Sequence, residues 1–167
     1  MTKIRIVGDN ALSNKCEQVN SVDDVKDVID ALWDKVTESN GAGLSANQIG
    51  YNVSVAVINN VSENEQFVII NPEILEFYGD STELREGCLS IPGVVGNVKR
   101  HLSLKLKYMD ENGVVGEGYF VGNSAHIIQH EVEHLNGKLY IDNYGKIRRD
   151  SMLKKHKKAL KKSKGEY

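Results

Sequence analysis

The amino-acid sequence predicts a single α+β domain. An amphipathic helix comes first, short strand-like segments separated by turn residues follow, and two further helical segments come last. Strands joined by short turns, with helices before and after them, are typical of the α+β class. A length of 167 residues suits one compact domain with a substantial core.

The first predicted helix covers Val22–Ser39, where apolar residues recur three and four positions apart. Ser21 is a suitable N-cap, and Asn40-Gly41 is a suitable stop signal. The glycine-rich segment Gly41–Gln48 follows. It has no phosphate-loop lysine, so we do not expect nucleotide binding there.

The middle of the chain alternates between strand and turn signals. Pro72 predicts a sheet edge or an irregularity, and Glu111-Asn112-Gly113 predicts a hairpin turn. Glu86–Gly93 is a polar segment that contains glycine. The predicted strands are Val53–Ile58, Phe67–Ile70 continuing towards Phe77, Leu102–Tyr108 and Val114–Val121.

Two helices are predicted in the last third of the chain. Gly122-Asn123-Ser124 can cap a helix that runs to about Leu135 and stops at Asn136-Gly137. The last helix is predicted over Arg148–Lys162 and has only a thin apolar stripe.

Composition excludes several classes of protein. The chain is 40% hydrophobic and 26% charged, and it has no apolar stretch of the length that a membrane helix needs. Met1–Asn10 lacks the pattern of a secretory signal, so we expect a cytoplasmic protein without a membrane partner. Two cysteines do not make a disulfide framework, and we interpret Cys16 as structural.

The helix after Gly122 carries His130-Glu-Val-Glu-His134, an H-E-x-x-H pattern. Residues four apart lie on one helix face, so both imidazoles can bind one metal ion. Glu131 can then reach a water molecule at the metal without being a ligand, and can act as general acid–base. The alternative is a solvated helix face. His126 continues the same spacing, and we interpret it as a pocket wall or capping residue, not as a fourth ligand.

Two histidines need a third ligand, because a catalytic site usually has three protein ligands and an open position. Metalloproteases with this pattern take the third ligand from downstream, but position 140 is Tyr140 and the only later glutamate is Glu166. Asp142 falls just after the helix and is expected to point away. Cys88 is the best upstream candidate, because its thiolate is a strong ligand.

Three segments together resemble, in order and spacing, the three motifs of the peptide deformylase family. They are Gly41–Gln48, Glu86–Ser90 and Gln129–Gly137, and the resemblance extends from about Val22 to about Asp142. It implies antiparallel strands wrapped around a central helix that carries the H-E-x-x-H pattern. It also implies removal of the N-formyl group from the N-terminal formyl-methionine of newly synthesised polypeptides, with release of formate.

The resemblance further implies roles for individual residues. Glu131 is the general acid–base, and Gln48 and the backbone N–H of Leu89 stabilise the oxyanion. The metal is Fe(II) in the cell, and Zn(II), Ni(II) or Co(II) can replace it. The implied metal ligands are Cys88, His130 and His134. The implied substrate-binding residues are Gly43, Leu44, Glu86, Gly87, His126 and Ile127, with Leu84 and Asn123 as further parts of the methionine pocket.

The sequence departs from the family pattern beside the site. Ser45 replaces the usual alanine, and Glu133 replaces an aspartate that helps to hold a ligand histidine and pairs with an arginine, here Arg100. Asn123 and His126 are more polar than a methionine pocket suggests, which bears on the preferred first side chain of the substrate.

The charge is unevenly distributed. Residues 146–167 hold ten Lys and Arg against Asp150 and Glu166, whereas residues 1–145 are acidic. We expect a catalytic metallohydrolase domain over residues 1–147 and a basic helix or tail over 148–167 that belongs to the same domain. This tail is either a solvated helix or a contact to ribosomal RNA. We expect a monomer.

Two other functions are open from the sequence. A general metallopeptidase would cleave internal peptide bonds, but the missing downstream ligand counts against it. A catalytically inactive homologue would bind only metal or the ribosome, but the presence of Cys88, Gln48, Glu131 and both histidines argues against it.

Overall fold

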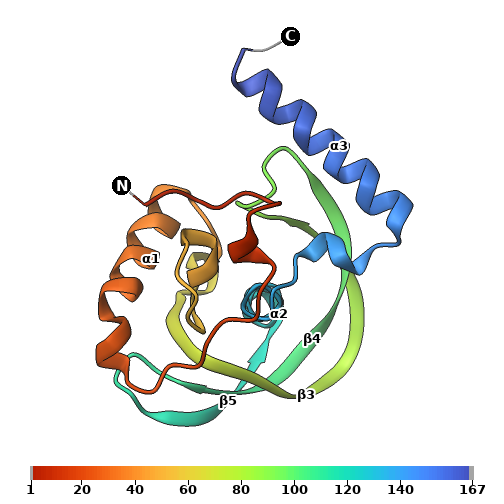
Figure 1. Ribbon diagram of the computed structural model, residues 1–167. Helices are drawn as coiled ribbons and strands as arrows, with labels where there is room; N and C mark the ends of the chain where they lie inside the picture. Colours follow the sequence, from red (N-terminus) through yellow and green to blue (C-terminus); the bar gives the residue numbers. More distant parts are fainter. Residues whose placement is uncertain (1, 166–167) are drawn as a thin grey trace.

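Within residues 2–165, which the structure describes, a five-stranded antiparallel sheet organises the fold (Figure 1, a computed structural model). Each strand pairs with the strand next to it in sequence, so the order across the sheet is β1-β2-β3-β4-β5. The predicted α+β class is confirmed. The strands are β1 (Gly43–Ser45), β2 (Val55–Asn60), β3 (Glu65–Gly87), β4 (Val95–Met109) and β5 (Val115–Val121).

The helices of the described chain are close to their predicted places. The predicted Val22–Ser39 helix is present, but its first turn is a 3₁₀ helix capped by the hydroxyl of Ser21. The α-helices are α1 (Lys26–Glu38), α2 (Gly122–Leu135) and α3 (Lys146–Ser163). The 3₁₀ helices are Asn10–Leu12, Val22–Val25, Ala46–Ile49, Val61–Glu63 and Tyr140–Asn143.

β3 and β4 are longer than the sequence predicts, and their pairing extends to Gly87 opposite Val95. Glu86 and Gly87 are therefore the last two residues of β3, whereas a polar segment without strand structure is expected there from the sequence. Many side chains on this half of the ribbon are exposed, and an exposed sheet face can be polar. The irregularity predicted at Pro72 is confirmed by a register shift between Ile70 and Glu73.

β2 divides the core, because both of its faces are buried. Val55 and Val57 pack in the cluster that contains the apolar face of α1, whereas Ala56 and Ile58 pack in the cluster that contains α2. Alternating side chains of a strand point to opposite faces, which explains the continuous apolar run here. α2 is seen end-on in Figure 1, inside the curve of β3, β4 and β5.

α2 begins at Gly122 without a side-chain cap, so the capping role predicted for residues 122–124 is wrong. The hydroxyl of Ser124 instead hydrogen-bonds with Asn60 and Glu65 of the β2–β3 hairpin. The predicted end of the helix is confirmed, since Gly137 has a φ of 73°, a conformation that favours glycine.

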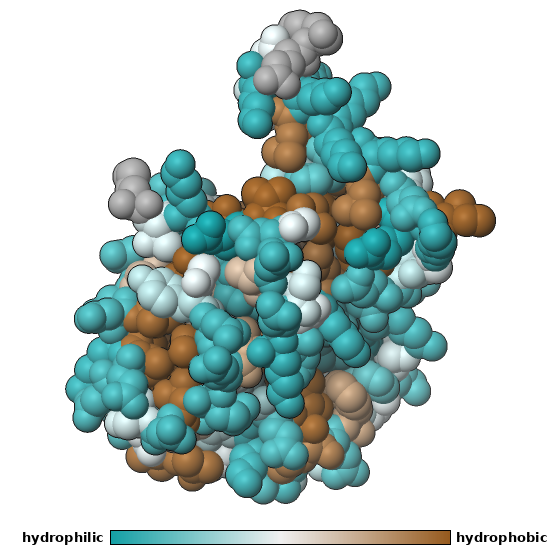
Figure 2. Space-filling view, in the orientation of Figure 1, coloured by the Kyte–Doolittle hydropathy of each residue, from teal (hydrophilic) through white to brown (hydrophobic). Residues whose placement is uncertain are grey.

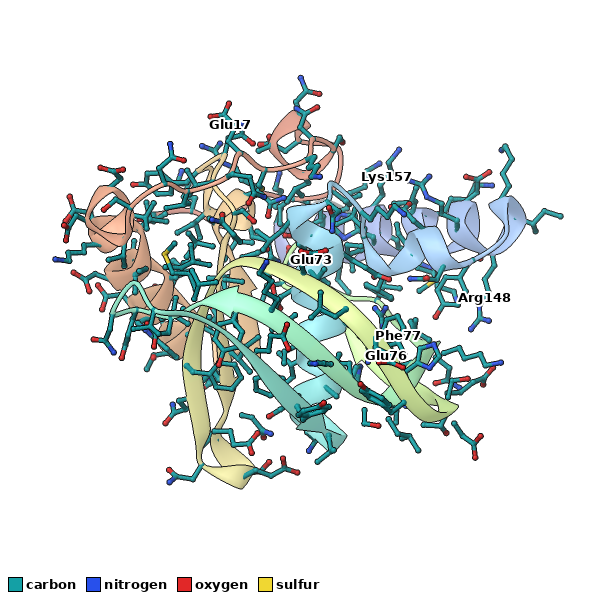
Figure 3. All side chains as sticks on the ribbon, turned by 90° about the horizontal axis from the view of Figure 1, so that it is seen from below. Glu17, Glu73, Glu76, Phe77, Arg148 and Lys157 are labelled. Carbon is teal, nitrogen blue, oxygen red and sulfur yellow. The ribbon has the colours of Figure 1, made fainter. Side chains whose placement is uncertain are left out.

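α3 extends away from the rest of the molecule (Figure 1), and Figure 2 shows mostly hydrophilic side chains along it. Arg148 and Lys157 are labelled on it in Figure 3. Met152 and His156 are buried against the body, and His156 Nδ1 lies 2.8 Å from the carbonyl oxygen of Pro92. The expected boundary between residues 147 and 148 falls inside α3.

The helices were compared with the requirements of a membrane span. No helix among the described residues is both long enough and apolar enough to cross a membrane.

Candidate functional site

Three side chains with metal-binding atoms converge where α2 passes the end of β3. His130 and His134 are one helical turn apart on α2, and Cys88 directly follows β3. The Nε2 atom of His134 lies 3.2 Å from Cys88 Sγ and 3.2 Å from His130 Nε2. One ligand atom from each residue fits within a spread of 4.8 Å, as expected for ligands of one ion.

The chemistry of these donors fits a divalent cation. Although burial alone lowers the pKa of His130, contacts with Cys88 and Glu86 raise it well above its usual value. Burial lowers the pKa of His134 well below its usual value. Two imidazole nitrogens and one sulfur are donors that a divalent cation accepts, and metal binding releases protons from such ligands.

The downstream ligand candidates are engaged elsewhere. Asp142 accepts hydrogen bonds from Leu139 N–H and from Arg149, whose Nε lies 2.9 Å away. The Tyr140 hydroxyl donates to the carbonyl oxygen of Val94. Glu166 lies outside the described residues.

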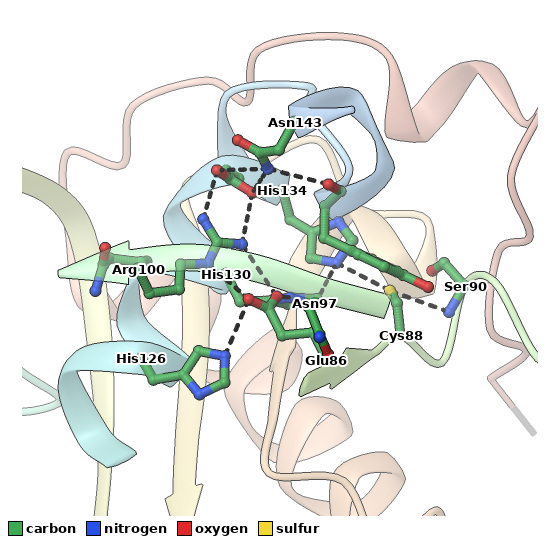
Figure 4. A network of polar contacts seen from close by, with 12 residues as sticks. Glu86, Cys88, Ser90, Asn97, Arg100, His126, His130, His134 and Asn143 are labelled. Atoms are coloured by element: carbon green, nitrogen blue, oxygen red, sulfur yellow. Dashed lines mark hydrogen bonds and ion pairs between the residues drawn. The ribbon is translucent and has the colours of Figure 1, made fainter. Parts of the chain in front are cut away.

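Glu86 connects the metal-binding residues to a buried ionic network (Figure 4). Its Oε1 lies 2.6 Å from His130 Nδ1, and its Oε2 lies 3.0 Å from His126 Nε2. Arg100 donates to both oxygens at 2.7 and 3.0 Å. Burial alone would raise the pKa of Glu86, but these three partners lower it well below its usual range. Glu86 is therefore an ionised acceptor that orients His130.

Glu133 lies at the far side of Arg100. The Arg100 guanidinium donates to both Glu133 oxygens, at 2.6 and 2.9 Å, and Asn143 also donates to this carboxylate. The expected pair of Glu133 and Arg100 is therefore present. Glu86, and not Glu133, contacts His130, so Glu133 is connected to this histidine through Arg100 and Glu86.

Glu131 faces the convergence point from the same helix. Its side chain is 3% exposed, and its Oε2 has no hydrogen-bond partner within the described chain. Burial raises the pKa of Glu131 to about 7. A carboxyl group with a pKa near neutrality can both accept and donate a proton under cellular conditions.

Gln48 is held in one orientation beside Cys88. Its Oε1 accepts from the backbone N–H of Ser45 at 3.0 Å, so its amide nitrogen faces Ser90 Oγ at 3.1 Å and Cys88 Sγ at 3.6 Å. The Ser45 hydroxyl also lies 3.0 Å from the same Gln48 oxygen. Ser45, a departure from the family pattern, is therefore compatible with this orientation.

These residues open into a cavity of about 1000 Å³. Leu44, which is expected to bind substrate, and Leu84, which is expected in the wall of the methionine pocket, do not line it. The Leu44 side chain is fully buried in the core with α1. The cavity is also not lined by Arg100, Glu133 or His134. The expected site residues that do line it are Gly43, Gln48, Glu86, Gly87, Cys88, Leu89, Asn123, His126, Ile127, His130 and Glu131.

Gly43 allows β1 to approach α2 closely. A Cβ atom at this position would lie 2.8 Å from both Glu131 Oε1 and Ile127 Cγ2. We expect Gly43→Ala to displace Glu131 and to lower kcat/KM by about 10²-fold, because ångström-scale misplacement has effects of this size. Gly116→Ala is a matched control, since a Cβ there meets nothing within 4 Å. Equal activity of both variants in a formate-release assay would show that the close approach does not matter.

Comparison with known proteins agrees with this geometry. Residues 1–150 match the family model described as polypeptide deformylase. This chain belongs to the peptide deformylase family. A peptide deformylase of Mesorhizobium japonicum is 38% identical over 160 residues, which are 93% of this chain and 91% of that protein. A peptide deformylase of Karelsulcia muelleri is 38% identical over 144 residues, 84% of this chain and 76% of that protein.

Solved deformylase structures share the whole fold. A crystal structure of a peptide deformylase from Legionella pneumophila has a TM-score of 0.90 and 32% identity, and the match covers 98% of this chain and 97% of that one. A peptide deformylase from Synechococcus elongatus in complex with actinonin has a TM-score of 0.85 and 34% identity, covering 93% and 85%. The resemblance drawn from three motifs is confirmed.

The deformylase motifs alone did not reveal the second role of Glu86. From the sequence, Glu86 is expected only in the substrate pocket. No local signal could have shown its contact with His130, because that contact depends on the extension of β3 as far as Gly87.

Proposed function

We propose that this protein is a metal-dependent amide hydrolase that removes the N-formyl group from the N-terminal formyl-methionine of newly synthesised polypeptides. The observation that carries the proposal is the convergence of Cys88, His130 and His134 beside the buried carboxyl group of Glu131, whose Oε2 has no hydrogen-bond partner among residues 2–165. Three protein ligands leave one coordination position of the metal for water or substrate. Glu131 is not one of the proposed ligands, so its carboxyl group can transfer protons.

Cys88, His130 and His134 would hold the metal ion. When bound, a divalent cation supplies Lewis acidity, which activates water and polarises the formyl carbonyl group. We propose Fe(II) in the cell, with Zn(II), Ni(II) or Co(II) as replacements in isolated protein. Geometry and availability decide between these metals more than affinity does.

Glu131 carries the proton transfers. Its carboxylate accepts a proton from the attacking water and returns it to the leaving nitrogen of the peptide. The pKa of about 7 suits both directions of transfer. Formate and a free N-terminal amine are the products.

Gln48 and Leu89 stabilise the negative charge that develops on the formyl oxygen. The Gln48 amide nitrogen already faces Cys88, and the backbone N–H of Leu89 makes no hydrogen bond among residues 2–165. Fixed donors aimed at a developing charge stabilise the transition state without reorganisation. Arg100 and Glu133 support the site indirectly, because they fix Glu86 and hence His130.

The substrate chain is proposed to bind beside β1 like an added strand. β1 pairs only with β2, so its other edge is available for backbone hydrogen bonds from the substrate through Gly43 and Leu44. Leu44 can contribute only its backbone, since its side chain is buried. The remaining wall is proposed to come from Glu86, Gly87, His126 and Ile127.

The test is formate release from a formyl-Met-Ala-Ser peptide by protein loaded with one metal ion per chain. Acetyl-Met-Ala-Ser and an unmodified protein substrate serve as controls. Release from the formyl peptide alone is expected. Cleavage of internal peptide bonds would support a general metallopeptidase instead, and no product from fully loaded protein would support an inactive homologue.

We further propose that α3 contacts ribosomal RNA, that the enzyme acts in the cytoplasm where new chains are made, and that it is a monomer. α3 exposes lysines along its length, whereas Met152 and His156 attach it to the body. Cationic side chains on one helix bind phosphates by releasing counterions, so the interaction weakens as salt rises.

Neutralising this charge should weaken ribosome binding. Lys154, Lys157, Lys158 and Lys161 are exposed, so their replacement by Gln leaves the buried contacts of α3 intact. We expect co-sedimentation with ribosomes at low salt, a loss of about tenfold or more in the quadruple variant, and normal binding in Lys138→Gln. Binding that is equal in all three proteins and insensitive to salt would refute the contact.

A further inference from the structure

The position of the first substrate side chain follows from covalent geometry and from the site proposed above, on which this inference rests. The formyl carbon must lie beside His130 and Glu131, and the side chain branches two bonds later. From the formyl carbon to the tip of an extended methionine is six bonds, about 7–8 Å. Asn123 lies seven residues before His130 on α2, which is about 10 Å along the helix. The tip therefore reaches the level of His126 and Asn123.

His126 presents an unused nitrogen at this level. Its Nε2 lies 3.0 Å from Glu86 Oε2, an oxygen that also accepts from Arg100 Nε, so we assign Nε2 as the donor to this carboxylate. No hydrogen bond within residues 2–165 involves its Nδ1, and this atom is not one of the fully buried atoms that lack a partner. In Figure 4 the ring turns one nitrogen towards Glu86 and the other away from it.

Asn123 is an exposed residue that lines the cavity, and no hydrogen bond to its side chain occurs in the described chain. The neighbouring polar wall residues differ in this respect. Asn60 donates to Glu63 and Ser124, and Ser62 donates to Asn60. The side chains of Asn60 and Ser62 therefore have hydrogen-bond partners within the protein. Within the described chain, the Asn123 amide and His126 Nδ1 can bond only to solvent or to a bound substrate.

We infer that this subsite accepts, in addition to methionine, first side chains of methionine's length with a hydrogen-bonding tip, such as the amide of glutamine or the sulfoxide of oxidised methionine, and favours them over norleucine. An amide tip offers both a donor to His126 Nδ1 and an acceptor to the Asn123 amide. A sulfoxide oxygen accepts from Asn123. A purely apolar tip covers both polar groups without pairing them, which costs binding energy. Oxidised initiator methionine is thus an expected substrate.

The test compares substrates within each protein, so that a general loss of activity cancels. kcat/KM is measured by formate release from four tripeptides that differ only in the first residue: formyl-methionine, formyl-norleucine, formyl-glutamine and formyl-methionine sulfoxide. The variants are Asn123→Leu, His126→Ile and the double variant. Asn112→Leu, an exposed asparagine in the β4–β5 turn, is the matched control.

We expect the ratios of glutamine and sulfoxide substrates to norleucine to fall by about five- to tenfold in each single variant and further in the double variant. The control should leave them unchanged. Ratios that stay within twofold in the double variant, with formyl-methionine still hydrolysed, would overturn this inference alone. No formate from any of the four peptides with metal-loaded wild-type protein would overturn the proposed function and this inference together.

Discussion

Glu131→Gln is expected to lower kcat/KM for formate release by about 10³-fold, within the range usual for a lost general acid–base. The two side chains have nearly the same shape, so the close approach of residue 131 to Gly43 is retained. The amide cannot accept a proton from water or return one to the leaving nitrogen. Because Glu131 is not a ligand, the metal content of the variant should equal that of the wild type.

The control for this variant is the metal content of the same preparation, together with its thermal unfolding. A buried carboxyl with an unpaired oxygen is costly, so Glu131→Gln should be as stable as the wild type or more stable. A variant that holds its metal and still hydrolyses the formyl peptide within tenfold of the wild-type rate would remove Glu131 from its proposed role.

Cys88→Ala is expected to abolish both metal retention and formate release. Two histidines remain in this variant, but the soft thiolate that completes the ligand set is lost. Removal of Cys88 also leaves the Gln48 amide and the Ser90 N–H without their shared sulfur acceptor. We expect the metal content after dialysis to fall well below one ion per chain, and activity to fall by more than about 10³-fold.

Cys16→Ala is the matched control, because Cys16 is the other cysteine and is buried in the core cluster that contains α2. Its burial raises its pKa to about 11, so it is a protonated, inert thiol. This variant should keep its metal and its activity and lose only about 1 kcal/mol of stability. A Cys88→Ala protein that retains a stoichiometric metal ion would mean that the third ligand is another residue.

The candidate metal-binding residues could be predicted from the sequence, because local rules bring the two histidines together. Spacing of four residues on α2 places His130 and His134 on one face, and the absence of a suitable downstream residue directs attention to Cys88. The peptide deformylase motifs then supplied roles for Gln48 and Leu89.

The pairing of distant segments was harder to predict from the sequence. No local pattern shows that β3 and β4 continue pairing through polar residues as far as Gly87, because an exposed sheet face can take almost any side chain. The orientation of Glu86 follows from that pairing, so its contact with His130 was missed. The family resemblance led us to expect the pair of Glu133 and Arg100, which is present, but it did not indicate that Glu86 lies between Arg100 and His130.

The most direct test of the central claim pairs metal analysis with a formate assay on one sample of anaerobically prepared protein. We expect about one divalent ion per chain and formate release from formyl-Met-Ala-Ser, with both lost in Cys88→Ala and only the activity lost in Glu131→Gln. Protein that carries a full complement of metal and releases no formate would contradict the proposed deformylase activity.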